Sequence, residues 1–263
     1  MDKKDLLKKF NNSDDRMLLS KILDRAEKTE TSGTVMFTDF LDPHQQKLVE
    51  KALSSQPGVK LTFFSGYPGA ERAIAVLSPN DVVSEDDCDK RPPVKLLNIA
   101  IKSRNILTHR DFLGALMALG IKREKIGDIF VREDSCSVLV MEDIAEYIRT
   151  NLTKAGNSEL DTEITNVSEI SVPEPKVKEI SSTVASLRLD SIASVGFGIS
   201  RSKMTEFIKA EKVSLNWEAV SSTSKIVKES DTISIKGKGR VVVKSVGGMT
   251  KKGRIGIKLE RML

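Results

Sequence analysis

The segment Gly198–Val213 reads "GISRSKMTEFIKAEKV" and has the pattern of an amphipathic helix with a basic outer face. Ser200 is a good N-cap, because its hydroxyl accepts a backbone N–H of the first turn. Apolar side chains recur at helical spacing and predict a stripe that docks on a core, made of Met204, Phe207, Ile208 and Val213. At 3.6 residues per turn, Arg201 and Lys212 project within about 20° of each other, and Lys209 lies about 80° from Arg201. We therefore expect an exposed cationic face, which is also what an ordinary solvated helix presents.

The segments on either side predict two helices set against short strands. Upstream, "SLRLDSIASVGFG" (186–198) predicts a helix closed by Gly196 or Gly198, with inward side chains Leu189, Ile192 and Ala193. Downstream, "VSLNW" (213–217) predicts a strand, and "KIVKESDTISIKGKGR" (225–240) predicts a second one that carries Lys236, Lys238 and Arg240. The segments 240–248 and 253–261 predict a closing hairpin. In such a unit, cations of the helix and of the strand ends can converge on one nucleic-acid backbone.

Charge is distributed unevenly along the 263 residues, whose net charge is +5. Residues 181–263 hold 16 Lys and Arg against 7 Asp and Glu, a net charge of +9, whereas residues 1–180 hold 26 against 30. Neutralisation of phosphates by Lys and Arg supplies most non-specific affinity for nucleic acids. A polyanion partner for the C-terminal third is one interpretation, and a well-solvated basic surface is compatible with the same charges.

Composition indicates a soluble globular protein with two domains, at 39% hydrophobic and 30% charged residues. The sequence has no apolar run of about 18 residues, and its start, "MDKKDLLKKF", lacks the apolar region of a signal peptide. We therefore expect a cytoplasmic protein without a membrane partner. Cys88 and Cys136 stand far apart with no second pair, which predicts reduced structural thiols.

The pattern before residue 170 predicts an α+β domain, with a largely antiparallel sheet covered by helices on one face. The predicted helices are 42–55, capped by Asp42, then 108–120, capped by Thr108, and 142–156. The apolar face of the second helix is expected to hold Phe112, Leu113, Leu116 and Met117. The predicted strands are 59–66, 71–79, 94–102, 126–131 and 135–141, and the alternation over 162–170 fits a last strand.

Domain boundaries follow from the polar, acidic stretch before residue 181. Pro173 and Pro175 hold the residues before them in extended conformations, which is typical of a linker. We expect an N-terminal helical segment over 1–30, the α+β domain over 31–170, a linker over 171–182 and a C-terminal domain over 183–263.

The sequence lacks the motifs of common active sites, so we expect no enzyme, no cofactor and no small-molecule substrate. His44 and His109 are its only histidines, and neither has the spacing of a metal ligand. The turn "SGYPGAER" (65–72) predicts a tight hairpin in which both glycines take positive φ, with Arg72 beside it as a candidate phosphate contact. A solvated loop, lacking the ligand order of a calcium site, is predicted around Asp86, Asp87 and Asp89.

The C-terminal third contains R-L-D, a glycine, S-R, a basic helix, V-x-L-N and S-D-T-I, in that order. The residues that carry this pattern are Arg188, Leu189, Asp190, Gly196, Ser200, Arg201, Lys209, Val213, Asn216, Asp231 and Ile233. It resembles the RNA-binding domain named after the fourth protein of the small ribosomal subunit, here called the S-four domain. The sequence departs from the family at Trp217 and Ser230, where glycine often stands. The resemblance implies that the helical pair and the adjoining loop grip structured RNA.

Two further motifs, "FFSGYPGAERA" and "LTHRDFLGALMALGIKREKIGDIFV", extend the likeness along nearly the whole chain. With the C-terminal S-four domain, they resemble the bacterial YlmH-like proteins. That resemblance implies binding to ribosomal RNA or tRNA on the large ribosomal subunit, in quality control of stalled complexes that carry peptidyl-tRNA.

The candidate RNA-binding residues are Arg188, Ser200, Arg201, Lys203, Lys209, Lys212, Asn216, Lys225, Lys236, Lys238 and Arg240. A second candidate patch consists of Arg72, His109, Arg110, Lys122, Arg123 and Lys125, for which solvation of a helix start and a turn is the alternative explanation. No catalytic or metal-binding residue is predicted. An RNA-modifying enzyme stays open as an alternative, because S-four domains are often appended to such enzymes, and so does a protein adaptor linked to cell division.

Overall fold

Residues 6–8, 10, 12–54, 56, 58–80, 91–103, 105–173 and 177–262 are described by a computed structural model of the chain. The chain divides into two units, Met1–Pro173 and Glu174–Leu263, and each is considered by itself. The expected acidic loop with Asp86, Asp87 and Asp89 lies outside the described residues, as do Cys88 and Pro175.

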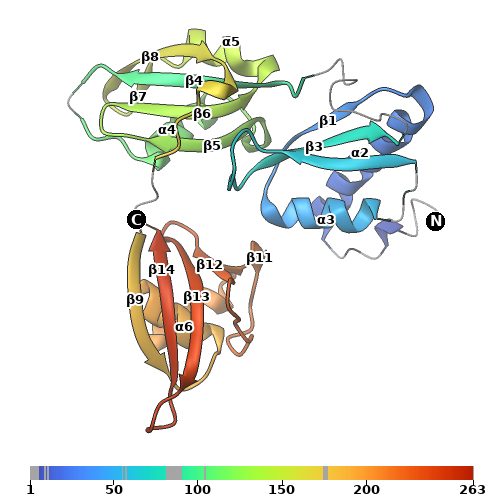
Figure 1. The fold of residues 1–263 in the computed structure, drawn as a ribbon. Helices are drawn as coiled ribbons and strands as arrows, with labels where there is room; N and C mark the ends of the chain where they lie inside the picture. The colour runs from blue at the N-terminus through green and yellow to red at the C-terminus, as the bar shows by residue number, and fades with distance from the viewer. Residues whose placement is uncertain are drawn as a thin grey trace. The chain divides into compact units, whose positions relative to one another are not determined.

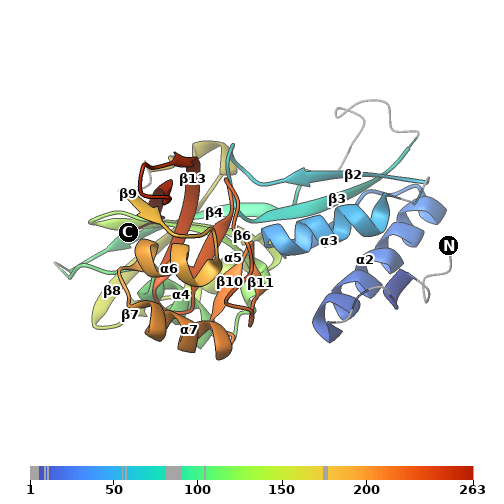
Figure 2. The ribbon, with the colours of Figure 1, turned by 90° about the horizontal axis from the view of Figure 1, so that it is seen from below.

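The first unit begins with a three-stranded lobe, in which two helices cover one face of a small antiparallel sheet (Figure 2). Its elements are α2 (Ser13–Ser32), β1 (Met36–Leu41), α3 (Pro43–Leu53), β2 (Val59–Phe64) and β3 (Ala73–Pro79), with strand order β1-β3-β2. Asp42 and Gln45 form a capping box at the start of α3, as the sequence predicts. The turn 65–72 joins β2 to β3 in a hairpin with positive φ at Gly66 and Gly69. The predicted hairpin is thus confirmed.

A five-stranded lobe completes the first unit (Figure 1). Its strands are β4 (Val94–Ile101), β5 (Ile126–Val131), β6 (Ser135–Met141), β7 (Lys154–Ala155) and β8 (Ser158–Thr165), all antiparallel in the order β5-β6-β4-β8-β7. Helices α4 (His109–Ala118) and α5 (Glu142–Asn151) pack on one face of this sheet through Phe112, Leu116 and Ile148. Two short 3-10 turns, η2 (Arg123–Lys125) and η3 (Val167–Glu169), flank it.

The expectation of one sheet in this region is wrong, because the strands form two sheets. The two lobes share a core in which Phe40 and Ile74 pack against Leu96 and Leu139. This core covers the second face of β4 and β6 at one end, so both faces of these strands are buried there. Their nearly continuous apolar sequences follow from that burial, but such a pattern does not say which strands pair.

Two details of the five-stranded lobe also differ from expectation. The helix predicted over 142–156 ends at Asn151, and the chain then enters the β7–β8 hairpin, where Gly156 takes a positive φ. Met117, expected on the buried face of α4, is 43% exposed, because only Phe112 and Leu116 of this helix reach the core fully.

The second unit is a six-stranded antiparallel sheet packed against two helices (Figures 1 and 2). Its elements are β9 (Val177–Val184), α6 (Leu189–Phe197), α7 (Arg201–Lys209), β10 (Val213–Leu215), β11 (Glu218–Ala219), β12 (Thr232–Ile235), β13 (Gly239–Met249) and β14 (Ile255–Met262). The strand order is β11-β10-β12-β13-β14-β9. The β13–β14 pairing confirms the predicted closing hairpin. Gly196 brings α6 close to the sheet, since a Cβ atom there would lie 2.9 Å from Val241 Cγ1.

Three expectations for this unit need correction. The linker expected over 171–182 runs into β9, which pairs along its whole length with β14. The basic helix ends at Lys209, because Glu211 takes a left-handed conformation with φ 54°, so the angle calculated for Lys212 does not apply. The second predicted strand is limited to β12, and Lys236 and Lys238 lie in the turn that follows it.

Candidate RNA-binding surfaces

The carboxylate of Asp190 joins the two helices of the second unit. Asp190 is only 4% exposed, and its Oδ1 lies 3.1 Å from Nε of Arg188. Its Oδ2 lies 2.9 Å from Nη2 and 3.0 Å from Nε of Arg201, the first residue of α7. Burial alone raises the pKa of Asp190, but the hydrogen bonds from Arg188 and Arg201 outweigh it and hold the pKa below 3.8. Arg201 therefore ties α7 to α6, whereas Arg188 holds the same carboxylate from the start of α6; we did not predict these roles.

Two other candidates make contacts within the fold. Ser200 caps α7 by accepting the N–H of Lys203 at 3.4 Å, as the sequence predicts. Asn216 accepts the N–H of Thr232 at 2.9 Å and donates to Asp231 at 2.8 Å, which fixes the end of β10 against β12. The polar atoms of Asn216 are thus used within the unit, whereas the side chain of Lys203 is exposed.

Four exposed lysines gather where α7 ends and β12 turns into β13. The N–H of Lys236 donates to the carbonyl oxygen of Lys212 at 3.1 Å, so their backbones are adjacent. Nζ of Lys238 lies 5.8 Å from the ring centroid of Phe207, on the last turns of α7. We call this group the lysine cluster: Lys209, Lys212, Lys236 and Lys238. In the part of the chain that the structure describes, none of the four forms an ion pair.

Lys225 and Arg240 lie apart from the lysine cluster. Lys225 is exposed in the loop before β12, and its carbonyl oxygen accepts the N–H of Leu189 at the start of α6. Arg240 is half-buried at the start of β13, opposite Ser234 of β12. The sequence did not predict the contact between Lys238 and the ring of Phe207. An aromatic side chain on a basic helix is the feature that could have indicated it.

In the first unit, the structure brings together Arg72, Arg123 and His109 from three elements. Nη2 of Arg72, after the β2–β3 turn, donates to the carbonyl oxygen of Phe40 at 2.8 Å. Nη1 of Arg123, in η2, donates to the carbonyl oxygen of Gly127 at 3.2 Å and also to that of Ile126. These bonds are close in space, because a Cβ atom at Gly127 would lie 2.8 Å from the ring of Phe40.

The acid between these cations is Asp128 of β5. Its Oδ2 accepts Oη of Tyr67 at 2.6 Å and the N–H of Glu71 at 2.9 Å, so it holds the turn that carries Arg72. Burial raises the pKa of Asp128, although these hydrogen bonds and the charges of Arg72 and Arg123 act to lower it. Tyr67 and Asp128 were not predicted as part of a site, although an acid within the apolar strand "IGDIFV" is a signal for one.

The cations influence one another through partly buried surroundings. Burial, followed by the charge of Arg72, lowers the pKa of Arg123 to about 10, with Asp128 and Asp42 opposing. Burial also lowers the pKa of Arg72. His109 is exposed on one side. Partial burial of its other side lowers its pKa, and the positive charge of Arg123 lowers it further. Two guanidinium charges and one imidazole thus lie close together. We call them the arginine cluster: Arg72, Arg123 and His109.

The other candidates of the second patch differ in their surroundings. Nζ of Lys125 lies 2.9 Å from Oδ1 of Asp39 and 2.6 Å from Oδ2 of Asp143, so it ties β1 to α5. Burial alone lowers the pKa of Lys125, but the two carboxylates outweigh this effect and raise the pKa above its ordinary value. Arg110 and Lys122 are exposed. The structure therefore separates a fold-supporting Lys125 from the surface residues.

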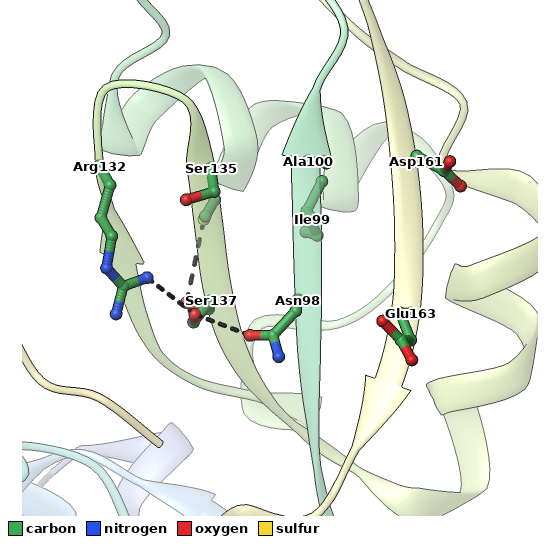
Figure 3. A pocket seen from close by; sticks show the side chains of 9 residues that line it. Asn98, Ile99, Ala100, Arg132, Ser135, Ser137, Asp161 and Glu163 are labelled. Atoms are coloured by element: carbon green, nitrogen blue, oxygen red, sulfur yellow. Dashed lines mark hydrogen bonds between the residues drawn. The ribbon is translucent and has the colours of Figure 1, made fainter. Parts of the chain in front are cut away.

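A groove of about 520 Å³ lies on the face of the five-stranded sheet opposite α4 and α5 (Figure 3). Nη1 of Arg132 donates to Oγ of Ser137 at 2.9 Å, and Oγ of Ser137 donates to Oδ1 of Asn98 at 2.9 Å. Asp161 and Glu163 of β8 form its other wall. The groove thus combines one cation with two carboxylates, and none of the predicted RNA-binding residues lines it.

The described residues contain no group of three His, Cys, Asp or Glu side chains arranged to hold a metal ion. No helix among them is long and apolar enough to span a bilayer.

Comparisons with known proteins agree with this architecture. The model of the N-terminal part of YlmH matches residues 14–82, and the model described as the putative RNA-binding domain in YlmH matches residues 93–169. The model of the S4 domain, called the S-four domain above, matches residues 187–233.

A Bacillus subtilis protein named "Ribosome-associated protein quality control protein P2" is 33% identical over 249 residues, which are 94% of this chain and 95% of that protein. The solved structure named "Cell division protein ylmH from Streptococcus pneumoniae" has a TM-score of 0.51 and 22% identity. The matched region covers 62% of this chain and 98% of the solved chain. This likeness supports the fold alone. The chain therefore belongs to the YlmH family, with an S-four domain in its C-terminal unit.

Proposed function

We propose that the protein binds structured RNA of the ribosome through the lysine cluster of its S-four unit. The observation that carries this proposal is a set of four exposed lysines at the end of α7 and in the adjacent β12–β13 turn, none of which forms an ion pair among the described residues. Cations that are not neutralised by the protein remain available to phosphates. Arg188 and Arg201, by contrast, share Asp190 within the fold, and the Arg201 contact fixes α7 to α6.

The biological setting that we propose is quality control of stalled large subunits that carry peptidyl-tRNA, in the cytoplasm. The name of the Bacillus subtilis relative supports it, because the two chains align over nearly their whole lengths. In this proposal the protein is not an enzyme, and it contacts ribosomal RNA, tRNA or both. Arg110 and Lys122 of the five-stranded lobe extend the contact, within the part that matches an RNA-binding family model.

Salt dependence of RNA affinity tests this proposal. For phosphate contacts, the logarithm of the affinity falls linearly with the logarithm of the salt concentration, with a slope of about 0.9 per contact to duplex phosphates. We expect Lys209→Gln combined with Lys236→Gln to make the slope shallower by about 1.8. A slope equal to that of the wild type would show that these lysines do not contact phosphates.

A further inference from the structure

We propose that the arginine cluster of the first unit is a binding site for a phosphate group, supplied by an RNA backbone. The assignment to RNA rests on the function proposed above, whereas phosphate binding itself does not. Its residues come from the end of the β2–β3 turn, from η2 and from the first position of α4, and the site is separate from the lysine cluster in sequence and in fold.

The two guanidinium groups are engaged by neutral acceptors of the backbone. Arg72 and Arg123 donate to the backbone carbonyl oxygens of Phe40, Ile126 and Gly127, which are neutral acceptors. Among the residues that the structure describes, neither arginine forms an ion pair. In addition, Nε of Arg72 is buried and has no hydrogen-bond partner in the described chain. Because this atom is enclosed by the protein, it is not itself a phosphate contact, but the missing hydrogen bond leaves the guanidinium charge of Arg72 less fully compensated within the fold.

Two of the carboxylates near the arginines are held by other groups of the fold. Three acids act on the arginines, namely Asp42, Asp128 and Glu124. Asp42 caps α3 through the N–H of Gln45 at 2.9 Å, and Asp128 accepts Tyr67 and the N–H of Glu71. The positions of Asp42 and Asp128 are set by these backbone and hydroxyl donors. The arginines are thus held near each other by the fold instead of by carboxylates that would occupy their outer N–H groups.

The donors of the arginine cluster suit the oxygen atoms of a phosphate group. A guanidinium group presents a planar fork of N–H donors that matches the oxygen atoms of a phosphate. Here two forks and an imidazole come from three different elements, and the exposed His109 marks the side that faces solvent. His109 is also the first residue of α4, where the helix dipole favours an anion. Several donors from different directions suit a tetrahedral anion with several oxygens.

Titration of the full chain with inorganic phosphate, at constant ionic strength, tests the site. We expect the wild type to bind phosphate, and Arg123→Gln to weaken the affinity about tenfold, the loss of one charge-assisted hydrogen bond. Arg149→Gln removes the same charge from an exposed position of α5 and should leave the affinity unchanged. His109→Ala alters an exposed side chain, so it tests the site even where Arg123→Gln affects folding.

Asp128→Asn distinguishes binding from a purely structural role. Asparagine keeps an acceptor oxygen for Tyr67 and for the N–H of Glu71, but it removes a negative charge next to the anion. We expect tighter phosphate binding by this variant. A wild type that does not bind phosphate, or Arg123→Gln and His109→Ala variants that bind it normally, would overturn the proposal.

Competition identifies the source of the phosphate. We expect a single-stranded RNA of about eight nucleotides to displace phosphate more effectively than a nucleoside monophosphate does. Displacement by the monophosphate alone would overturn the assignment to RNA. The Lys209→Glu, Lys236→Glu double variant separates this site from the lysine cluster: it should bind phosphate normally while its RNA affinity falls. Unchanged RNA affinity in that variant contradicts the function proposed for the lysine cluster and leaves the phosphate titration as a valid test.

Discussion

The guanidinium group of Arg201 lies 2.9 Å from the buried carboxylate of Asp190 and links the two helices of the S-four unit. The sequence placed Arg201 on an exposed basic face, and the side chain is indeed 54% exposed. Its inner edge, however, is used for this ion pair. A charge reversal at Arg201 therefore tests the fold as well as RNA binding.

Reversing the charge of Arg201 should destabilise the protein. In Arg201→Glu, two carboxylates face each other and a charge-assisted hydrogen bond is lost, so we expect the free energy of unfolding to fall by about 2 kcal/mol. Urea unfolding of the full chain measures it. Lys209→Glu, on the same helix and without an ion pair among the described residues, should stay within about 0.5 kcal/mol of the wild type. Equal stability of both variants would contradict the role of Asp190.

The same ion pair predicts a dependence on pH. The pKa of Asp190 in the folded protein lies below its ordinary value of 3.8, because the hydrogen bonds of Arg188 and Arg201 outweigh burial. Its contribution to stability is thus present above pH 3.8 and is lost as the pH falls through the lower folded-state pKa. We expect the difference in stability between the wild type and Asp190→Asn to shrink below pH 3.8. A difference that grows towards acid pH would exclude this explanation.

Ser230 stands where the family often has glycine, and its φ is 66°. This left-handed conformation strains a residue with a Cβ atom, whereas glycine adopts it freely. After the larger entropy loss of glycine is counted, Ser230→Gly should raise the free energy of unfolding by about 0.5 kcal/mol. Ser230→Ala keeps the strain and serves as the control. Loss of stability in Ser230→Gly would show that the strain is absent.

Cys136 should be unreactive in the folded protein. Burial raises the pKa of its thiol to about 12, with the charge of Arg132 acting in the opposite direction. Since the thiolate is the reactive form, alkylation near neutral pH should occur only when the chain unfolds. Mass spectrometry of the peptide that contains Cys136, with and without urea, measures this. Rapid labelling of the native protein would contradict its burial.

The sequence was most informative where local rules decide the structure. The capping box of α3, the glycines of the β2–β3 turn and the apolar stripe of α7 depend on a few neighbouring residues, and the structure has all three. Trp217 and Ser230, where the sequence departs from the S-four pattern, both have positive φ, which explains why glycine is common there.

The rest depends on contacts between distant residues. Arg72 and Arg123 are 51 positions apart in the sequence, and the carbonyl oxygens that they bind lie on β1 and β5, which approach each other closely where Gly127 faces the ring of Phe40. The ion pairs of Asp190 and of Lys125 also join separate elements, so helical spacing did not reveal them. The order of the strands in the first unit could not be predicted for the same reason, since an apolar strand pattern indicates burial and does not determine which strands pair.

Co-sedimentation with purified large ribosomal subunits tests the central claim most directly. We predict that the wild type co-sediments and that the Lys209→Glu, Lys236→Glu double variant stays in the supernatant. The control carries the same change of charge at Lys252 and Lys258, two exposed lysines of the β13–β14 hairpin in the same unit, and should co-sediment like the wild type. Sedimentation of the first double variant, or equal loss in both, would contradict binding through the lysine cluster.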